Sequence, residues 1–301
     1  MNYKTAVTVV MPCYNSENFV AKAIKSILSQ SMGDFEFIII NDASQDNTRN
    51  IIKKYLYDSR INFIDLNKNV GNYTARNMGM KIAKSKYIAV MDSDDIADKN
   101  RLEIQYSYLE KHRKIGCIGS QGYIVDEDDN VIGPTNKPTI ANVLKTCLLK
   151  NNFTIHPSLV YRTNLIKKHN LFYNECLTYS ADYDFVVRAS NKFKITNLEQ
   201  RLILYRRHSK QISKAKSKEQ AGFADKVRLS QLNSFELNYS EEEQRFFLKL
   251  MRDEQLTRNE LQTCIILMNR LLEQNKRKKV YFNKHLYHFF NYCIEEALLT
   301  D

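Results

Sequence analysis

Three carboxylates stand within four positions in Asp92-Ser93-Asp94-Asp95, directly after the apolar run Tyr87-Ile88-Ala89-Val90-Met91. The run is typical of a buried β-strand, so the carboxylates follow a strand end. Carboxylates this close repel one another unless a cation lies between them. Mg²⁺ and Mn²⁺ favour oxygen ligands and keep positions open for water or a substrate phosphate. The cluster therefore suggests a divalent metal that binds a nucleoside diphosphate. An acidic turn that caps the following helix is the alternative.

The first hundred residues alternate strand and helix patterns with short links. We expect strands at residues 7–11, 35–40, 61–64 and 87–91, and helices at residues 19–29, 46–57 and 73–83. This order predicts a parallel sheet covered by helices, with ligands beyond the carboxyl ends of the strands. Polar groups follow the first three strands at residues 12–15, 41–44 and 69–71.

Beyond residue 100 the pattern is mixed, with helices expected at residues 100–112, 140–149 and 182–190, a strand at 117–125 and paired strands within 195–205. From about residue 215 onward only helical periodicity remains. We therefore predict an α/β domain over residues 1–214 and an α-helical C-terminal extension over residues 215–301.

Composition indicates an ordinary globular protein, with 43% hydrophobic and 26% charged residues. No apolar run approaches the roughly 18 to 20 residues that span a bilayer, and the first residues lack a signal-peptide core, so a cytoplasmic protein is expected. The six cysteines contain no CxxC pair and are expected to be reduced packing residues. The net charge of +11 could attract nucleic acid, anionic lipid or an anionic substrate.

The first strand is followed by Pro-Cys-Tyr-Asn-Ser-Glu, not by the G-x-G-x-x-G of a dinucleotide-binding domain, and no Walker A sequence follows any strand. A nucleotide would therefore be held by side chains at successive strand ends and by a metal on its phosphates.

Residues 5–213 resemble family 2 glycosyltransferases, which have the GT-A fold. The matching segments, in the family's order, are residues 8–15, 27–30, 35–48, 69–71 with 75–79, 91–95, 180–185 and 205–208. The resemblance implies a Rossmann-like, mixed and mostly parallel sheet flanked by helices. It also implies an inverting reaction with a nucleotide-sugar donor. The resemblance does not include the predicted helical extension at residues 215–301.

The resemblance implies that Asp42 bonds to the uracil edge and that Arg76 lies near the base or the diphosphate. The family commonly has two acidic residues where this chain has Asn41-Asp42. An Asx turn or helix cap is the alternative for Asp42, and a solvated helix residue is the alternative for Arg76. The nucleoside pocket would be lined by Pro12, Tyr14 and Asn15.

In the acidic cluster, a DXD motif, the resemblance places Asp92 and Ser93 at the nucleotide, and Asp94 on a Mn²⁺ or Mg²⁺ ion that bridges the two phosphates. Such an ion acts as a Lewis acid on the leaving diphosphate. His208 would complete the metal or diphosphate site, although an isolated histidine is more often a packing residue. The basic neighbours of His208 suggest an anion-facing loop: Arg206, Arg207, Lys210 and Lys214.

An inverting transfer needs a general base that takes the proton from the attacking hydroxyl. In the family this base is the aspartate of a Glu-Asp pair at a helix start, and Asp182 matches it. Here the pair reads Ala181-Asp182, a departure that bears on the acceptor more than on the chemistry. A helix N-cap is the alternative for Asp182, and Asp184 is expected to face elsewhere.

The helical extension combines basic and aromatic residues at residues 275–282 and 286–292. Such a composition suits a peripheral contact with anionic lipid on the inner face of the cell membrane. The alternative is a helical cap whose aromatic side chains pack on the catalytic domain.

The sequence thus predicts a metal-dependent, inverting glycosyltransferase that moves a hexose or N-acetylhexosamine from a UDP-sugar to a glycan or lipid-linked acceptor. The expected process is the synthesis of a surface polysaccharide or lipooligosaccharide. A catalytically silent subunit of the same fold is the main alternative. The presence of all four aspartates with an assigned role argues against it: Asp42, Asp92, Asp94 and Asp182. The hypothesis of a nucleic-acid-binding protein is supported by the net charge alone. The sequence contains no recognised nucleic-acid-binding motif, so no nucleic-acid partner is expected.

Overall fold

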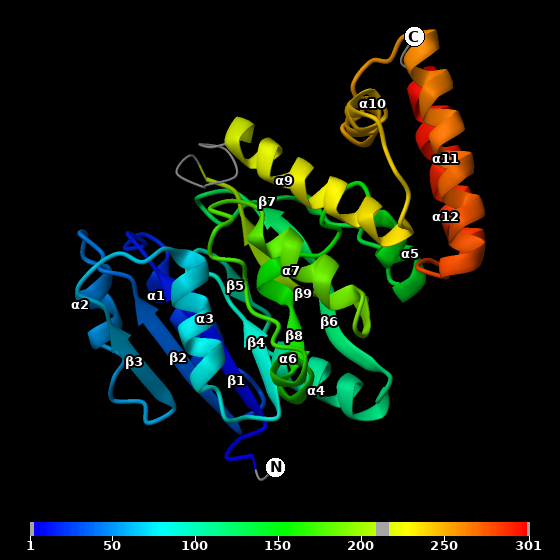
Figure 1. Ribbon diagram of the computed structural model, residues 1–301. Coiled ribbons are helices and arrows are strands. Elements are labelled where there is room, and N and C mark those ends of the chain that lie inside the picture. The colour runs from blue at the N-terminus through cyan, green and yellow to red at the C-terminus, as the bar shows by residue number, and fades with distance from the viewer. Residues whose placement is uncertain (1–2, 209–216, 300–301) are drawn as a thin grey trace.

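A computed structural model describes residues 3–208 and 217–299 of the chain (Figure 1). These residues contain a mixed sheet with the strand order β3-β2-β1-β4-β8-β6-β9-β5, and β7 pairs with β6. The strands are β1 (Val7–Cys13), β2 (Phe35–Asn41), β3 (Ile61–Asp65), β4 (Tyr87–Val90), β5 (Ile96–Ala97), β6 (Ile115–Val125), β7 (Val131–Pro134), β8 (Val160–Arg162) and β9 (Lys194–Arg206).

Strand β1 lies at the centre of four parallel strands, between β2 and β4. All its residues are buried, as expected for a strand that is covered on both faces. Cys13 pairs with Asn41, and Asn41 pairs with Asp65, so these three strands end at one level of the sheet. The polar segments that follow them consequently begin next to one another.

Helices cover both faces of this sheet, as predicted. On one face α1 (Val20–Leu28), α2 (Thr48–Lys53) and α4 (Arg101–Lys111) share a hydrophobic core with alternate residues of β1 and β2. The other core contains side chains of the helices α3 (Asn72–Ile82), α5 (Ala141–Cys147), α6 (Thr163–Lys168) and α7 (Ala181–Ser190). A short 3₁₀ turn at His156–Ser158 precedes β8.

The prediction of two strands within residues 195–205 is wrong, because this segment lies in the single strand β9. Opposite β6, the paired residues step from Gly119 and Asn197 to Gln121 and Arg201, so β9 has two more residues than β6 in this interval. The break in the sequence pattern is therefore a bulge and not a turn. The strand continues to Arg206, which brings its end to the acidic loop.

The C-terminal helices are α9 (Ser217–Leu232), the short turn Asn233–Phe235, α10 (Glu241–Met251), α11 (Arg258–Lys278) and α12 (Asn283–Leu299). Figure 1 shows α9 crossing above the sheet and α10, α11 and α12 grouped beyond α5. Ala224 and Val227 of α9 pack into the core of the α/β part, whereas Leu232 packs into a separate helical core. The predicted boundary at residue 214 lies outside the described residues.

The aromatic residues of this extension divide between core and surface. Tyr281 and Phe290 are buried, and the ring of Tyr281 stacks on Phe235 with 5.6 Å between centroids. Phe282 and Tyr287 are exposed. Within the described ranges, no helix is both long and apolar enough to cross a membrane.

Candidate active site

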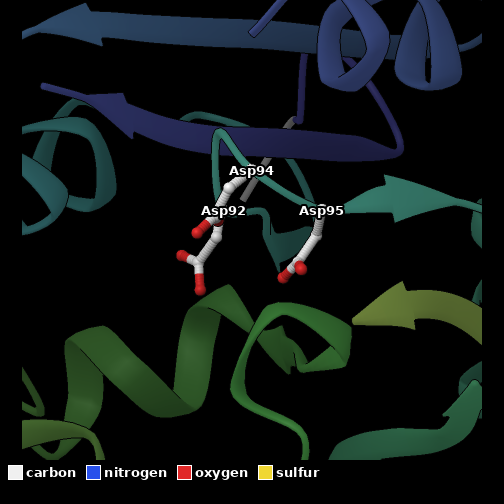
Figure 2. Close-up of side chains that lie close together, drawn as sticks. All are labelled: Asp92, Asp94 and Asp95. Atoms are coloured by element: carbon white, nitrogen blue, oxygen red, sulfur yellow. The ribbon is translucent and has the colours of Figure 1, made fainter. Parts of the chain in front are cut away.

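The three carboxylates lie in one loop after β4, at the carboxyl ends of the central parallel strands. Figure 2 shows the side chains of Asp92, Asp94 and Asp95 leaving this loop with their carboxylates on the same side of it. One oxygen of each lies within 4.8 Å of one oxygen of each of the others. Helix α4 begins only at Arg101 with Asn100 as its N-cap, so the cluster does not cap the following helix.

Arg76 of α3 lies against Asp92 and is fully buried. Its guanidinium donates to a carboxylate oxygen of Asp92 and, at 3.1 Å, to the backbone carbonyl of Met91. Burial by itself raises the pKa of Asp92, but the charge of Arg76 and the contact with His156 outweigh it and hold this pKa below its usual range. Asp92 is therefore ionised at neutral pH, and the alternative of a solvated Arg76 is wrong.

Asp95 is the buried member of the cluster, with 1% of its surface exposed. One carboxylate oxygen accepts the backbone N–H of Arg206 at 2.8 Å, and the other has no partner among the described residues. Burial, followed by the charges of Asp94 and Asp92, raises the pKa of Asp95 well above its ordinary value. A cation beside the loop would offset this repulsion.

His208 reaches Asp94 from the end of β9. Its Nε2 atom lies 2.9 Å from a carboxylate oxygen of Asp94, and its ring packs against Phe19 with 4.9 Å between centroids. His208 and Asp94, which the sequence predicts to lie at the same site, are therefore in contact.

The sequence suggested that Arg206 lies on an anion-facing loop, but its side chain is fully buried and its charge is paired within the protein. Its side chain donates to the backbone carbonyl of Asp94 at 2.8 Å and of Asp126 at 2.7 Å, and it forms an ion pair with Asp129. Arg206 thus fixes the acidic loop to the turn between β6 and β7. Lys210 and Lys214, predicted on the same loop, lie outside the described residues.

The donor atoms of this cluster fit a divalent cation. Ligands of an octahedral ion with bonds of about 2.1 Å lie about 3 Å apart, close to the separation of Asp94 and His208. Carboxylate oxygens suit Mn²⁺ or Mg²⁺, and an imidazole nitrogen among the ligands favours Mn²⁺. Asp92 and Asp95 offer further carboxylate oxygens within 4.8 Å of one another and of Asp94.

The segment after β1 lies at the same edge of the sheet. Pro12 is buried at the end of β1, whereas Tyr14 is 48% exposed. Asn15 has a φ of +48° and is held by the next loop: its side chain accepts the N–H of Gln45 at 2.8 Å, and its own N–H donates to Ser44 at 3.1 Å. An exposed ring beside a fixed turn provides a surface on which a base could stack.

Asp42 is 2% exposed, and both carboxylate oxygens accept backbone N–H groups, from Val70 at 2.7 Å and from Gly71 at 2.9 Å. It thus positions the start of α3, which neither an Asx turn nor a cap of α2 would do. Ser93 shares a hydrogen bond of 2.7 Å with Ser16, which connects the acidic loop to the loop after β1. A hydrogen bond therefore joins two of the segments that are predicted to bind the nucleotide.

Asp182 lies in the first turn of α7, but the N-cap is Ser180. One carboxylate oxygen accepts the hydroxyl of Tyr73 at 3.3 Å, and the other accepts the amide of Asn152 at 3.0 Å. Burial and the neighbouring charge of Asp182 raise the pKa of Tyr73 well above its ordinary value, so the phenol remains a donor. Asp184 instead pairs with Arg188 at 2.7 Å.

Three side chains lie between Asp92 and Asp182 in space, and the sequence predicted no role for them: His156, Tyr173 and Tyr73. His156 lies 3.9 Å from Asp92 through Nδ1, and its Nε2 atom lies 2.8 Å from the hydroxyl of Tyr173. The rings of Tyr173 and Tyr73 stack with 5.5 Å between centroids. His156, Tyr173 and Tyr73 lie outside the family segments identified in the sequence.

Comparison with known proteins agrees with this geometry. The family model "Glycosyl transferase family 2" matches residues 8–169. A protein of Methanocaldococcus jannaschii described as an uncharacterized glycosyltransferase is 38% identical over 208 residues, covering 67% of this chain and 71% of the relative. WfgD of Escherichia coli, a UDP-Glc:alpha-D-GlcNAc-diphosphoundecaprenol beta-1,3-glucosyltransferase, is 33% identical over 144 residues, covering 47% of this chain and 56% of the relative.

Solved structures confirm the GT-A fold. TarS 1–349 of S. aureus in complex with UDP-GlcNAc has a TM-score of 0.65 and 17% identity, covering 97% of this chain and 89% of that chain. The mannosyltransferase PcManGT of Pyrobaculum calidifontis in complex with GDP-Man and Mn²⁺ has a TM-score of 0.62 and 12% identity, covering 99% and 87% of the two chains. The match of the family model over more than half of the chain, together with the M. jannaschii relative, shows that this protein belongs to glycosyl transferase family 2 and is a transferase enzyme.

Proposed function

We propose that this enzyme is a metal-dependent, inverting glycosyltransferase that moves a hexose or N-acetylhexosamine from a UDP-sugar to a glycan or lipid-linked acceptor. The observation that carries the proposal is a continuous series of side-chain contacts, polar except for one pair of stacked rings, from the acidic loop to Asp182. It runs from Asp92 through His156, Tyr173 and Tyr73. These contacts connect the acidic loop, which would bind the nucleotide, to Asp182, which would face the acceptor.

At the nucleotide end, Asp94 and His208 would hold the metal, and Mn²⁺ is favoured over Mg²⁺ because Mg²⁺ prefers oxygen ligands alone. When bound, the ion supplies Lewis-acid stabilisation of the charge on the departing diphosphate. Pro12, Tyr14 and Asn15 would line the nucleoside pocket. Asp42, Arg76, Asp92 and Ser93 would contact the nucleotide or position the loops around it.

At the acceptor end, Asp182 would act as the general base. It would take the proton of the acceptor hydroxyl while that oxygen attacks the anomeric carbon of the donor sugar, and the bond from this carbon to UDP would break with inversion. Asp182 lies in the first turn of α7, and Tyr73 and Asn152 donate to its two carboxylate oxygens. These two donors also hold the carboxylate in one orientation.

The choice of UDP is supported by two of the similar proteins. WfgD is named for UDP-Glc and for a diphosphoundecaprenol-linked acceptor, and TarS was solved with UDP-GlcNAc. PcManGT was solved with GDP-Man, so guanine is the competing base. Because the acceptor named for WfgD is lipid-linked, we propose that this chain acts in the synthesis of a surface polysaccharide or lipooligosaccharide.

We further propose that the enzyme works at the cytoplasmic face of the membrane, with exposed Phe282 and Tyr287 of the extension in contact with anionic lipid. Removal of α12 would destroy the helical core, since Phe290 is buried there. Substitution of the exposed aromatics is therefore the cleaner test. A Phe282→Ser/Tyr287→Ser variant should co-sediment with phosphatidylglycerol vesicles less than the wild type does, and equal co-sedimentation would remove the membrane contact.

The donor is tested by measuring hydrolysis and thermal stabilisation with UDP-, GDP- and dTDP-sugars, each with Mn²⁺ and with a chelator. We expect a UDP-hexose or UDP-N-acetylhexosamine to be hydrolysed in the presence of Mn²⁺ and to raise the melting temperature. Stabilisation without hydrolysis or transfer would instead support a catalytically silent subunit, and activity only with GDP-sugars would overturn the assignment of the base.

A further inference from the structure

Helix α9 of the C-terminal extension lies against the two segments that carry Asp182 and its donor Asn152. Asp182 lies in the first turn of α7, and Asn152 lies in the segment that follows α5. Figure 1 shows α9 crossing above α7 and ending beside α5. A general base works only in the correct position, since a misplacement of about 1 Å can lower the rate about 10²-fold. The contacts that hold these two segments together therefore bear on the transfer step.

Three segments meet at the backbone carbonyl of Leu148, the residue that follows α5. This oxygen accepts the side-chain amide of Gln231 of α9 at 2.8 Å and the hydroxyl of Tyr183 of α7. The amide of Gln231 also donates to the hydroxyl of Tyr183 at 3.3 Å. Both side chains are buried, so these hydrogen bonds are shielded from water. The amide and the phenol therefore join α7 and the segment after α5 to α9.

The backbone that leads to Asn152 is held by α9 at a second point. Arg228 of α9 is buried, and its Nε atom donates to the backbone carbonyl of Lys150 at 2.8 Å. The carbonyls of Leu148 and Lys150 are thus both fixed to the extension. Because Asn152 follows closely and donates to Asp182 at 3.0 Å, its position depends on these contacts.

The start of α7 is also held by α9, on the other side of Asp182 along the chain. The hydroxyl of Ser180 donates to the backbone carbonyl of Gln220 in α9 at 3.2 Å. Ser180 is the N-cap of α7 and has a φ of +64°, a left-handed conformation that costs energy in a residue other than glycine. Asp182 therefore lies between two residues, Ser180 and Tyr183, that are both bonded to α9.

The rest of the extension orients the side chain of Gln231. Its amide oxygen accepts the hydroxyl of Tyr281 at 3.4 Å. Asn275 of α11 is fully buried and bonds to the backbone N–H and the carbonyl of Tyr281, each at 2.9 Å. With its oxygen directed to Tyr281, Gln231 presents its two N–H groups to Leu148 and Tyr183. The helical core of the extension is thus connected by hydrogen bonds to the helix that carries Asp182.

We propose that Gln231 and Tyr183 are positioning residues for the general base, through which the C-terminal extension holds Asp182 in place. This inference rests on the proposed function and goes beyond it, because it gives the extension a part in the transfer step. The hydrogen bonds of both residues join α7, α9 and the segment after α5, whereas Arg76 and Arg206 hold the acidic loop. Loss of these bonds should therefore lower the rate without weakening the binding of the donor.

The test uses full-length protein with Gln231→Met, which keeps the length of the side chain but removes the amide, and with Tyr183→Phe, which removes only the hydroxyl. The substrate is the UDP-sugar that wild type hydrolyses fastest among UDP-glucose, UDP-galactose and UDP-N-acetylglucosamine, with Mn²⁺ present and water as the acceptor. We expect each variant to lower the kcat of hydrolysis by about tenfold or more. The KM for the UDP-sugar and the affinity for UDP should not change.

The same substitutions made in an Asp182→Asn background separate positioning from general damage to the structure. A residue that acts through the base has nothing to position once the base is removed, so Gln231→Met and Tyr183→Phe should then have no further effect on the rate. An equal loss of rate in both backgrounds overturns the inference. Full activity of both single variants, or a parallel loss of UDP affinity, overturns it as well.

Gln244→Met serves as the matched control. Gln244 of α10 also lies in the extension, but its side-chain amide donates to the backbone carbonyl of Tyr239 at 3.5 Å. This variant loses the same chemical group and should keep the kcat of wild type. A wild type that neither binds UDP nor hydrolyses any of the three sugars would instead contradict the proposed function itself.

Discussion

Replacement of Asp94 by alanine is expected to lower the turnover number by about 10³-fold or more, because the metal loses a carboxylate ligand. A bound metal is worth several kcal/mol of transition-state stabilisation, and each 1.36 kcal/mol is tenfold in rate. The fold should survive, since the acidic loop is held through the backbone carbonyl of Asp94, which accepts from Arg206 at 2.8 Å. Initial rates of UDP release with saturating Mn²⁺, together with circular dichroism, measure both effects.

Asp128→Ala is the control for this variant. Asp128 is exposed in the turn between β6 and β7, near the loop that Arg206 holds, but it is not part of the acidic cluster. Its removal changes the net charge by the same amount and should leave the rate unchanged. A fully active Asp94→Ala enzyme would show that this carboxylate is not required, and the metal assignment would have to be abandoned.

The second large effect is expected for Asp182→Asn, which should lower the rate of transfer by about 10² to 10⁴, the usual contribution of a general base. Asparagine retains the size of the side chain and one oxygen that can accept from Tyr73 or Asn152. The affinity for UDP should be unchanged, because the contacts of Asp182 lie at the acceptor end. Transfer rates and UDP affinity measured on the same preparation separate the two effects.

Asp184→Asn provides a matched comparison for this prediction. Asp184 lies in the same first turn of α7 but pairs with Arg188 at 2.7 Å. Loss of this ion pair should cost at most about 1 kcal/mol of unfolding free energy and should not affect transfer. If the two variants lose the same activity, the effect of Asp182→Asn comes from disturbing the helix and not from loss of a base.

The first four strands could be predicted because each is an apolar run between polar turns, and three of them are buried on both faces. Their parallel pairing followed from the alternation with helices. Because parallel strands end at the same edge, the residues that follow them were expected to lie together. The pairing of β1, β2 and β3 agrees with this, since Cys13, Asn41 and Asp65 lie at one level. The position of the acidic loop at this edge needed no further information.

The contacts that join distant segments could not be predicted. Nothing local indicates that Arg206 turns inward, because an arginine in a basic segment has the sequence appearance of a solvated residue. Its burial depends on the carbonyls of Asp94 and Asp126, which only the assembled sheet brings together. The contact of His156 with Asp92 is of the same kind. Propensity and periodicity carry no signal for such contacts.

The central claim is that a divalent cation anchored by Asp94 binds the diphosphate of the donor. Isothermal titration of UDP into the wild-type protein, with Mn²⁺ and again after chelation, tests it most directly, with Asp94→Ala titrated alongside. We expect UDP to bind in the presence of Mn²⁺ and to lose at least about tenfold in affinity without the metal or without the carboxylate. Equal UDP binding under all three conditions, or none in any of them, would contradict the account.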